Sequence, residues 1–151
     1  MSKLPSRLFK INLLKMLGND VVDLRLAKIQ SNWKRRNYLS KIYSAGEQIY
    51  IDAADDPDLI VWLLWSMKEA AYKIVNRNTS IRCYEPKGFC CSFELNGSSA
   101  KGEVSYRGEK FLTHSEFSPE RIHTLSFGTG VCPAQCRVIQ LSDTSYYKSI
   151  S

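Results

Sequence analysis

One carboxylate and two lysines interrupt an otherwise apolar segment near the middle of the chain. The helical run from about Leu59 to Val75 begins with apolar residues and then carries Lys68, Glu69 and Lys73. A helix that is apolar on most sides is buried, and buried charges usually pair or bind a metal. Glu69 and Lys73 lie one turn apart on one flank, whereas Lys68 points elsewhere. They form either a solvated ion pair or a reactive carboxylate and ammonium at the edge of the core.

A short apolar segment nearer the N-terminus carries two further carboxylates. Gly18 marks its start, and two adjacent valines favour a strand. On a strand, Asp20 and Asp23 would face opposite sides, so only one of them could join Glu69. The alternative is that Asp23 caps the next helix and Asp20 is a turn residue.

Three motifs in this order resemble those of the 4'-phosphopantetheinyl transferase superfamily. Gly18-Asn19-Asp20 is similar to the Gly-x-Asp strand of that family. The segment 38–47 is similar to its aromatic-x-x-Arg/Lys-Ile-x-Ser/Thr-x-x-Glu segment, and here Ser44 and Glu47 also have the spacing of a capping box. The segment 65–73 is similar to its Trp-x-x-Lys-Glu-(Ala/Ser)-x-x-Lys helix. The resemblance covers about half of the chain.

The resemblance implies a chemical reaction and a set of site residues. The family moves 4'-phosphopantetheine from coenzyme A to a serine of an apo acyl or peptidyl carrier protein. Mg²⁺ suits this reaction because it binds carboxylate, phosphate and water oxygens. By resemblance, Asp20 and Glu69 are metal ligands, Glu69 is also a candidate base for the serine proton, and Lys73 neutralises phosphate charge. Lys68 is expected to face a phosphate as well, and the role of Asp23 is open.

Two features depart from the family pattern. Larger members carry a third acid two residues after the aspartate of the Gly-x-Asp motif, where this chain has Val22. The site therefore resembles that of the small holo-acyl-carrier-protein synthases, which is expected to use two carboxylates. The Ser-x-Thr-His strand of that group has no clear counterpart, and Thr113-His114 and the segment 121–127 are the nearest candidates. The residues of the coenzyme A pocket and the identity of the carrier protein stay open.

The periodicity of apolar residues predicts an α+β domain, with helices first and an antiparallel meander after them. We expect helical turns within 24–37, a helix at about 45–54, and a long buried helix that follows a turn and N-cap at 55–58 and ends at 76–78. Strands are expected at 89–95, 102–107, 109–115 and 121–127, with tight turns at 96–97 and 107–108. Residues 16–130 would form the domain, and 131–151 an irregular tail.

Composition narrows the class of protein. The chain has 151 residues, of which 44% are hydrophobic and 24% charged, as in ordinary globular proteins. Its net charge of +6 suits a polyphosphate or acidic partner and is too small to indicate DNA binding. No apolar run is long enough to span a membrane. Five cysteines, two of them adjacent, suggest neither a disulfide framework nor a zinc site, so we expect reduced thiols and a cytoplasmic protein.

The remaining expectations concern the N-terminus, the assembly and the rival functions. Residues 1–15 contain four basic residues and no signal peptide, so they are either an extension or lie upstream of a start at Met16. The long helix, with Trp62 and Trp65, is too apolar for one short chain to bury, which predicts a homo-oligomer. The resemblance to the small family members implies a trimer first, with a dimer as the second choice. The rival functions are an inactive module that binds coenzyme A or a carrier protein, and a small basic nucleic-acid-binding protein.

Overall fold

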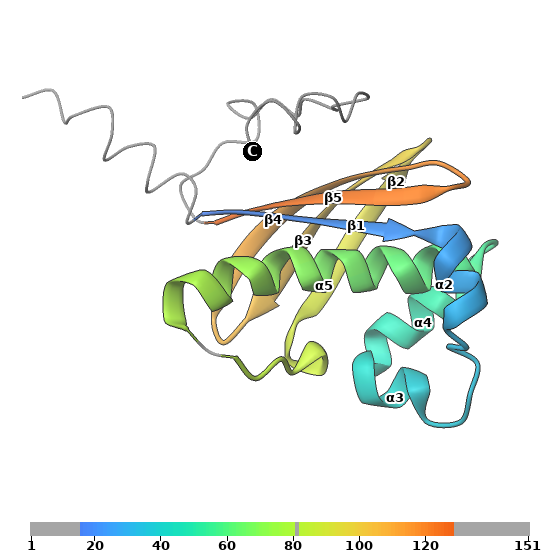
Figure 1. The fold of residues 1–151 in the computed structure, drawn as a ribbon, viewed down its shortest axis with the longest axis horizontal. Coiled ribbons are helices and arrows are strands. Elements are labelled where there is room, and N and C mark those ends of the chain that lie inside the picture. The colour runs from blue at the N-terminus through green and yellow to red at the C-terminus, as the bar shows by residue number, and fades with distance from the viewer. Residues whose placement is uncertain (1–15, 81, 129–151) are drawn as a thin grey trace, which may run out of the picture.

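One long helix lies across a five-stranded antiparallel sheet (Figure 1). The computed structural model describes residues 16–80 and 82–128. Its elements are β1 (Leu17–Asp23), α2 (Leu24–Gln30), α3 (Tyr38–Ile42), α4 (Ala45–Ala53), α5 (Pro57–Thr79), the 3-10 helix η1 (Pro86–Gly88), β2 (Cys90–Asn96), β3 (Ser99–Tyr106), β4 (Glu109–Phe117) and β5 (Arg121–Phe127). This arrangement confirms the expected α+β class.

The sheet has the strand order β1-β5-β4-β3-β2, and every neighbouring pair is antiparallel. Strands β2 to β5 form the expected meander. The first strand then closes the sheet by pairing with the last, with Gly18 opposite Ser126 and Asp20 opposite Thr124. This non-local pairing, which no local pattern predicts, brings the Gly-x-Asp segment to the edge of the sheet beside α5.

Local sequence signals set the ends of the main elements. The side chain of Asp56 accepts a hydrogen bond from the Leu59 amide at 3.2 Å and caps α5, which ends at Thr79, directly after the expected end at 76–78. Ser80 ends the helix in a left-handed conformation with φ of 56°. The β3–β4 turn has positive φ at both Arg107 and Gly108, as a tight hairpin requires.

The long helix is buried within this single chain. Trp62 is 7% exposed, and the side chains that follow it at 63 and 64 are fully buried. Helix α5 packs on β1, β5 and α4, while Tyr84 covers part of Trp65. The expectation that one chain cannot cover this helix is therefore wrong for residues 62–64, because the closing strand β1 and the segments around α5 supply surfaces that the meander alone lacks, whereas Trp65 is only partly buried.

Exposed apolar side chains lie on other parts of the surface. Within the described ranges, the face of the sheet opposite α5 has no helix over it (Figure 1). Val21 and Leu112 project from that face and are 55% and 49% exposed. Other exposed apolar side chains are those of Leu26, Ile29, Ile49, Tyr50 and Leu95. Among the described residues, the large exposed apolar side chains therefore lie outside α5.

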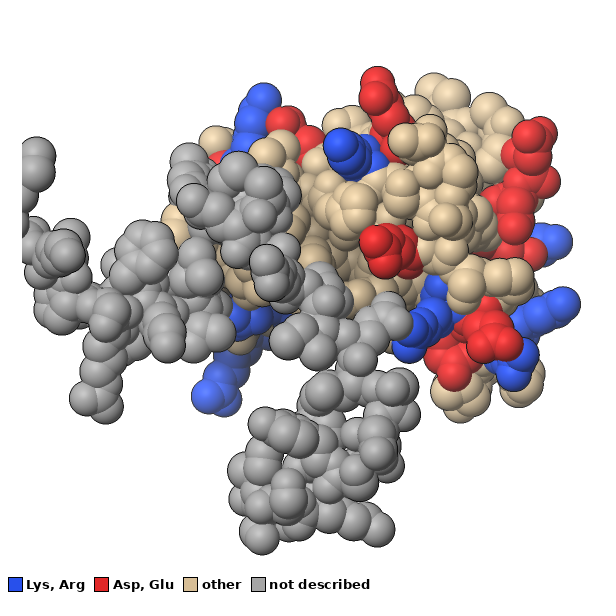
Figure 2. All heavy atoms as spheres, turned by 90° about the horizontal axis from the view of Figure 1, so that it is seen from above, with Lys and Arg blue, Asp and Glu red and all other residues tan. Residues whose placement is uncertain are grey.

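The surface charges of the two signs are interspersed. Figure 2, which shows the molecule from above, has acidic and basic side chains side by side over the described part of that face. No helix within the described residues is both long enough and apolar enough to cross a bilayer.

Candidate functional site

Strand β1 places Asp20 against the long helix. Buried and exposed residues alternate along β1, so Asp20 shares the face of Gly18 and Val22, which is directed toward α5. The Asp20 side chain is 13% exposed and accepts a hydrogen bond from the Lys73 ammonium at 3.1 Å. Its second oxygen, Oδ2, is buried and has no hydrogen-bond partner among the described residues. A buried, unpaired carboxylate oxygen is costly, so this position suits a cation or a hydrogen-bond donor.

Helix α5 brings Glu69 and Lys73 to the same place. Lys73 Nζ also donates to the backbone carbonyl of Asn19 at 2.6 Å, so the lysine joins α5 to β1. Partial burial raises the pKa of the Glu69 carboxyl, the negative charge of Asp20 raises it further, and Lys73 lowers it in part. Glu69 is therefore within electrostatic reach of both other groups. Three of the expected site residues, Asp20, Glu69 and Lys73, come together from two elements.

Asp23 has a structural task instead. It is the N-cap of α2, and its Oδ1 accepts hydrogen bonds from the backbone amides of Arg25 at 2.9 Å and Leu26 at 3.0 Å. The helix cap expected as one alternative is therefore present at Asp23. Asp20 lies within strand β1 and not in the turn that the same alternative expected. Only Asp20 therefore faces the long helix.

The structure places Lys68 differently from the expected phosphate contact. Its side chain is 0% exposed, and its ammonium lies 2.9 Å from both carboxylate oxygens of Glu47. The same ammonium donates to the backbone carbonyls of Pro86 and Phe89. These four acceptors take up all three N–H groups of the ammonium, so this lysine stabilises the interior, and we correct its assignment from coenzyme binding to a structural role.

The carboxylate of Glu47 combines this ion pair with a helix cap. The capping box expected from the sequence is present, since the Ser44 amide donates to Glu47 at 2.9 Å and the Ser44 hydroxyl accepts from the Glu47 amide. Glu47 also accepts from the Cys91 amide of β2 at 2.8 Å. These contacts join α4, α5 and β2 directly behind the turn that carries Glu69, and they hold that turn in place.

Tyr84 is a residue near the site that sequence reasoning missed. Its hydroxyl oxygen is buried without a hydrogen-bond partner in the described part of the chain. Burial raises the pKa of Tyr84, and the negative charge of Glu69 is the next largest cause, with Asp20 contributing less. Tyr84 is thus within electrostatic reach of both carboxylates. No motif or period singles out one tyrosine in an irregular segment, so only the fold could reveal it.

Of the two candidates for the missing C-terminal motif, Thr113-His114 lies on β4 and the segment 121–127 forms β5. Thr113 is buried on the α5 side of the sheet, and its hydroxyl lacks a partner within the described residues. His114 lies on the opposite face, where its Nε2 is 3.6 Å from Glu116. Two of the five cysteines, Cys132 and Cys136, lie outside the described residues.

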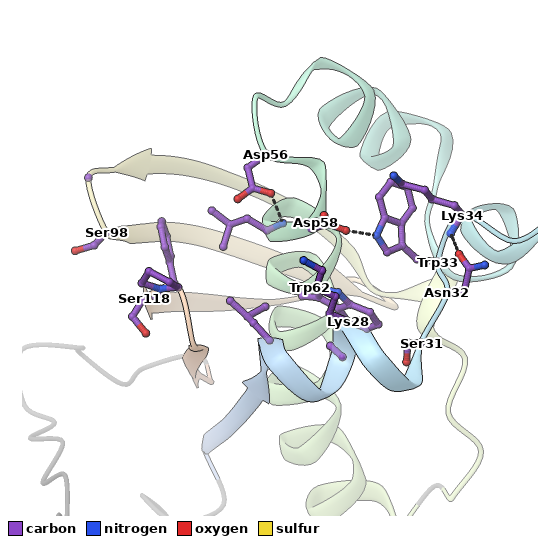
Figure 3. Close-up of a pocket in the computed structure, with 16 residues that line it drawn as sticks. Lys28, Ser31, Asn32, Trp33, Lys34, Asp56, Asp58, Trp62, Ser98 and Ser118 are labelled. Carbon is purple, nitrogen blue, oxygen red and sulfur yellow. Dashed lines mark hydrogen bonds between the residues drawn. The ribbon is translucent and has the colours of Figure 1, made fainter.

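A pocket of about 800 Å³ lies near the N-terminal end of α5 (Figure 3). Trp33 and Trp62 contribute apolar surface, Lys28 and Lys34 contribute positive charge, and Trp33 Nε1 donates to Asp58 at 2.6 Å. The pocket is formed by α2, the segment after it and two strand turns. Asp20, Glu69 and Lys73 do not line it, so it is a separate feature of the surface.

The carboxylate oxygens at the site fit a hard cation that binds further oxygen ligands from water or substrate. Within the described ranges, no group of three or more histidine, cysteine or acidic residues is arranged to hold a metal. Asp20 and Glu69 supply carboxylates alone, and one buried oxygen of Asp20 is unpaired. Mg²⁺ binds proteins through one or two carboxylates and completes its shell with substrate phosphates and water, so these residues fit it.

Comparisons with known proteins found a matching family model and similar solved structures. The model of the 4'-phosphopantetheinyl transferase superfamily matches residues 16–136. The holo-[acyl-carrier-protein] synthase of Neisseria meningitidis is similar in structure, with a TM-score of 0.57 and 18% identity over 76% of this chain and 97% of that one. The synthase of Thermotoga maritima has a TM-score of 0.54 and 12% identity over 89% of this chain and 73% of that one. At such identities the likeness concerns the fold alone. No curated protein matches this chain by sequence.

Proposed function

Because the chain belongs to the 4'-phosphopantetheinyl transferase superfamily, we propose that it transfers 4'-phosphopantetheine from coenzyme A to a serine of an apo acyl carrier protein. We further propose that it does so as a holo-[acyl-carrier-protein] synthase that requires Mg²⁺. The observation that carries the proposal is the meeting of Asp20 with Glu69 and Lys73, with one Asp20 oxygen buried and unpaired.

The proposed reaction breaks a phosphorus–oxygen bond within the pyrophosphate of coenzyme A. The serine oxygen attacks the phosphorus that carries the pantetheine, and adenosine 3',5'-bisphosphate leaves with the bridging oxygen. Asp20 and Glu69 would hold Mg²⁺, which when bound offsets the negative charge of the pyrophosphate. Lys73 is 41% exposed, so its ammonium can move from Asp20 to a phosphate oxygen and neutralise its charge.

Glu69 is the proposed acceptor of the serine proton, directly or through one water. The carboxylate is partly buried within electrostatic reach of Asp20 and Lys73, where it can accept a proton. Burial, which is the largest cause of the raised pKa, also limits the competing access of water. The same residue would then serve as metal ligand and as base, as the resemblance implies.

We also propose that the active protein is a homo-oligomer, a trimer first and a dimer second. Apolar side chains such as Val21 and Leu112 on the uncovered face of the sheet support this proposal. The free thiols of Cys83, Cys90 and Cys91 support the cytoplasm as the setting. Light scattering at micromolar concentration tests the assembly, and a fully active monomer would contradict it.

A transfer assay tests the proposed function. The protein is incubated with Mg²⁺, coenzyme A and several apo carrier proteins, and mass spectrometry follows the carrier. We expect the mass of one phosphopantetheine group to be added by the wild type, and Glu69→Gln to add none over the same time. If no carrier gains mass although coenzyme A still raises the melting temperature, the protein is a binding module and the proposal is wrong.

A further inference from the structure

The hydroxyl group of Tyr84 is a polar group near the candidate site whose state calls for an explanation. Tyr84 lies between α5 and η1, and its hydroxyl oxygen is buried with no hydrogen-bond partner within the described residues. Buried tyrosine hydroxyls ordinarily have a partner, because an unpaired one costs free energy. The position is therefore one at which stability is given up, and such positions are typical of functional sites.

Ring contacts locate Tyr84 over the turn of α5 that carries Glu69. The Tyr84 ring centroid is 5.9 Å from that of Trp65 and 4.4 Å from that of Tyr72. Trp65 precedes Glu69 by four residues and Tyr72 follows it by three, so both flank Glu69 on the same side of the helix. A ring that contacts both flanking residues lies across the turn between them.

The ring is also held from the other side. Its centroid is 5.8 Å from that of Phe89, whose ring stacks on Tyr106 at 4.0 Å with planes 6° apart. Phe89 is itself held by its carbonyl, which accepts from the buried Lys68. These ring contacts hold Tyr84 in place, within electrostatic reach of Glu69 and Asp20.

Two unpaired polar atoms next to the site have complementary chemistry. Asp20 Oδ2 accepts and carries negative charge, so it suits a cation, whereas the Tyr84 hydroxyl can donate to an anion. A divalent cation bound to a pyrophosphate presents both partners at once. We propose that Tyr84 is a further binding residue, and that its hydroxyl donates a hydrogen bond to a pyrophosphate oxygen of coenzyme A. This inference rests on the proposed function.

The test compares Tyr84→Phe with Tyr106→Phe, which removes a hydroxyl from the same aromatic cluster. Melting temperatures are measured alone and with coenzyme A and Mg²⁺, and calorimetry gives the dissociation constant of coenzyme A. We expect Tyr84→Phe to melt at or above the wild-type temperature when alone, since it loses an unpaired buried group. Coenzyme A should raise the melting temperature of this variant less than that of the wild type. The dissociation constant of coenzyme A should increase about tenfold or more. Tyr106→Phe should keep the wild-type response to coenzyme A.

Three results would overturn the inference, each in a recognisable way. If Tyr84→Phe melts lower when alone and responds normally to coenzyme A, the hydroxyl has a structural partner. Calorimetry with Mg²⁺ alone separates the metal from the phosphate. If Tyr84→Phe already loses Mg²⁺ binding without coenzyme A, the hydroxyl acts on the ligands of the metal and not on phosphate. If the wild type itself gains no stability from coenzyme A, the proposed function fails and this inference falls with it.

Discussion

Gly18 of β1 lies directly against the backbone of α5 at Ala70. A β-carbon placed on Gly18 would be 2.0 Å from the carbonyl oxygen of Ala70 and 3.1 Å from Cγ1 of Ile74. Strand and helix therefore approach so closely that only glycine fits. Because side chains two residues apart share a face of a strand, this approach also brings Asp20 to the helix, next to Glu69 and Lys73. The glycine and the aspartate of the motif are thus parts of one arrangement.

Substitution of that glycine should destabilise the protein. Gly18→Ala would force β1 away from a helix carbonyl that cannot move aside, and we expect a loss of about 1–3 kcal/mol in the free energy of unfolding. The matched control is Gly46→Ala in α4, where a β-carbon would meet nothing within 4 Å. That change should stabilise by about 0.5–1 kcal/mol. Urea unfolding measures both, and similar effects at the two positions would show that the close approach is wrong.

The two aspartates of β1 should respond differently to the same change. Asp20→Asn removes a charge from the candidate site, so kcat/KM for transfer should fall by about 100-fold or more. Asp23→Asn keeps the cap of α2, because asparagine caps a helix as well as aspartate does. It should therefore retain wild-type kinetics and melting temperature. Steady-state kinetics on both variants, with circular dichroism as the check on folding, decide the matter, and equal losses would contradict the division of roles.

The raised pKa of Glu69 predicts a pH-dependent stability difference. Because its pKa in the folded protein exceeds its ordinary value of 4.5, the folded protein binds this proton at a higher pH than the unfolded chain does. The ionised carboxylate therefore lowers stability above the raised pKa, and this cost is absent below 4.5. Glu69→Gln should melt higher than the wild type at pH 7 without ligand. The difference should vanish as the pH falls below 4.5. If Glu69→Gln melts lower than the wild type at pH 7, the ionised carboxylate stabilises the fold, and the prediction is wrong.

The buried pair of Glu47 and Lys68 should matter to the fold rather than to the reaction. Lys68→Met leaves a buried carboxylate without its cation and should cost about 3–5 kcal/mol. The double variant Glu47→Gln with Lys68→Met should recover part of this loss, since neither residue then carries an unpaired charge. Chemical denaturation of the single and double variants measures the coupling. If Lys68→Met has normal stability but no longer binds coenzyme A, Lys68 contacts phosphate after all, and the structural role assigned to it here is wrong.

Short-range spacing in the sequence determined much of the local structure. The interval of three residues between Ser44 and Glu47 predicted a capping box, and both of its hydrogen bonds are present. The run of apolar residues predicted the buried helix α5, and the change to a period of two predicted four of the five strands with their turns. These features depend on neighbours within about one turn or one hairpin, so the residues that decide them are adjacent in the sequence.

Only the tertiary structure decided which distant residues meet. Opposite faces of a strand could be assigned to Asp20 and Asp23 from the sequence, but the pairing of β1 with β5 selected the face that meets α5. The burial of Lys68 with Glu47 and the position of Tyr84 over the turn of Glu69 depend in the same way on packing between elements. Sequence periodicity states which side of an element is apolar, whereas the partner of that side is chosen by the packing of the whole chain.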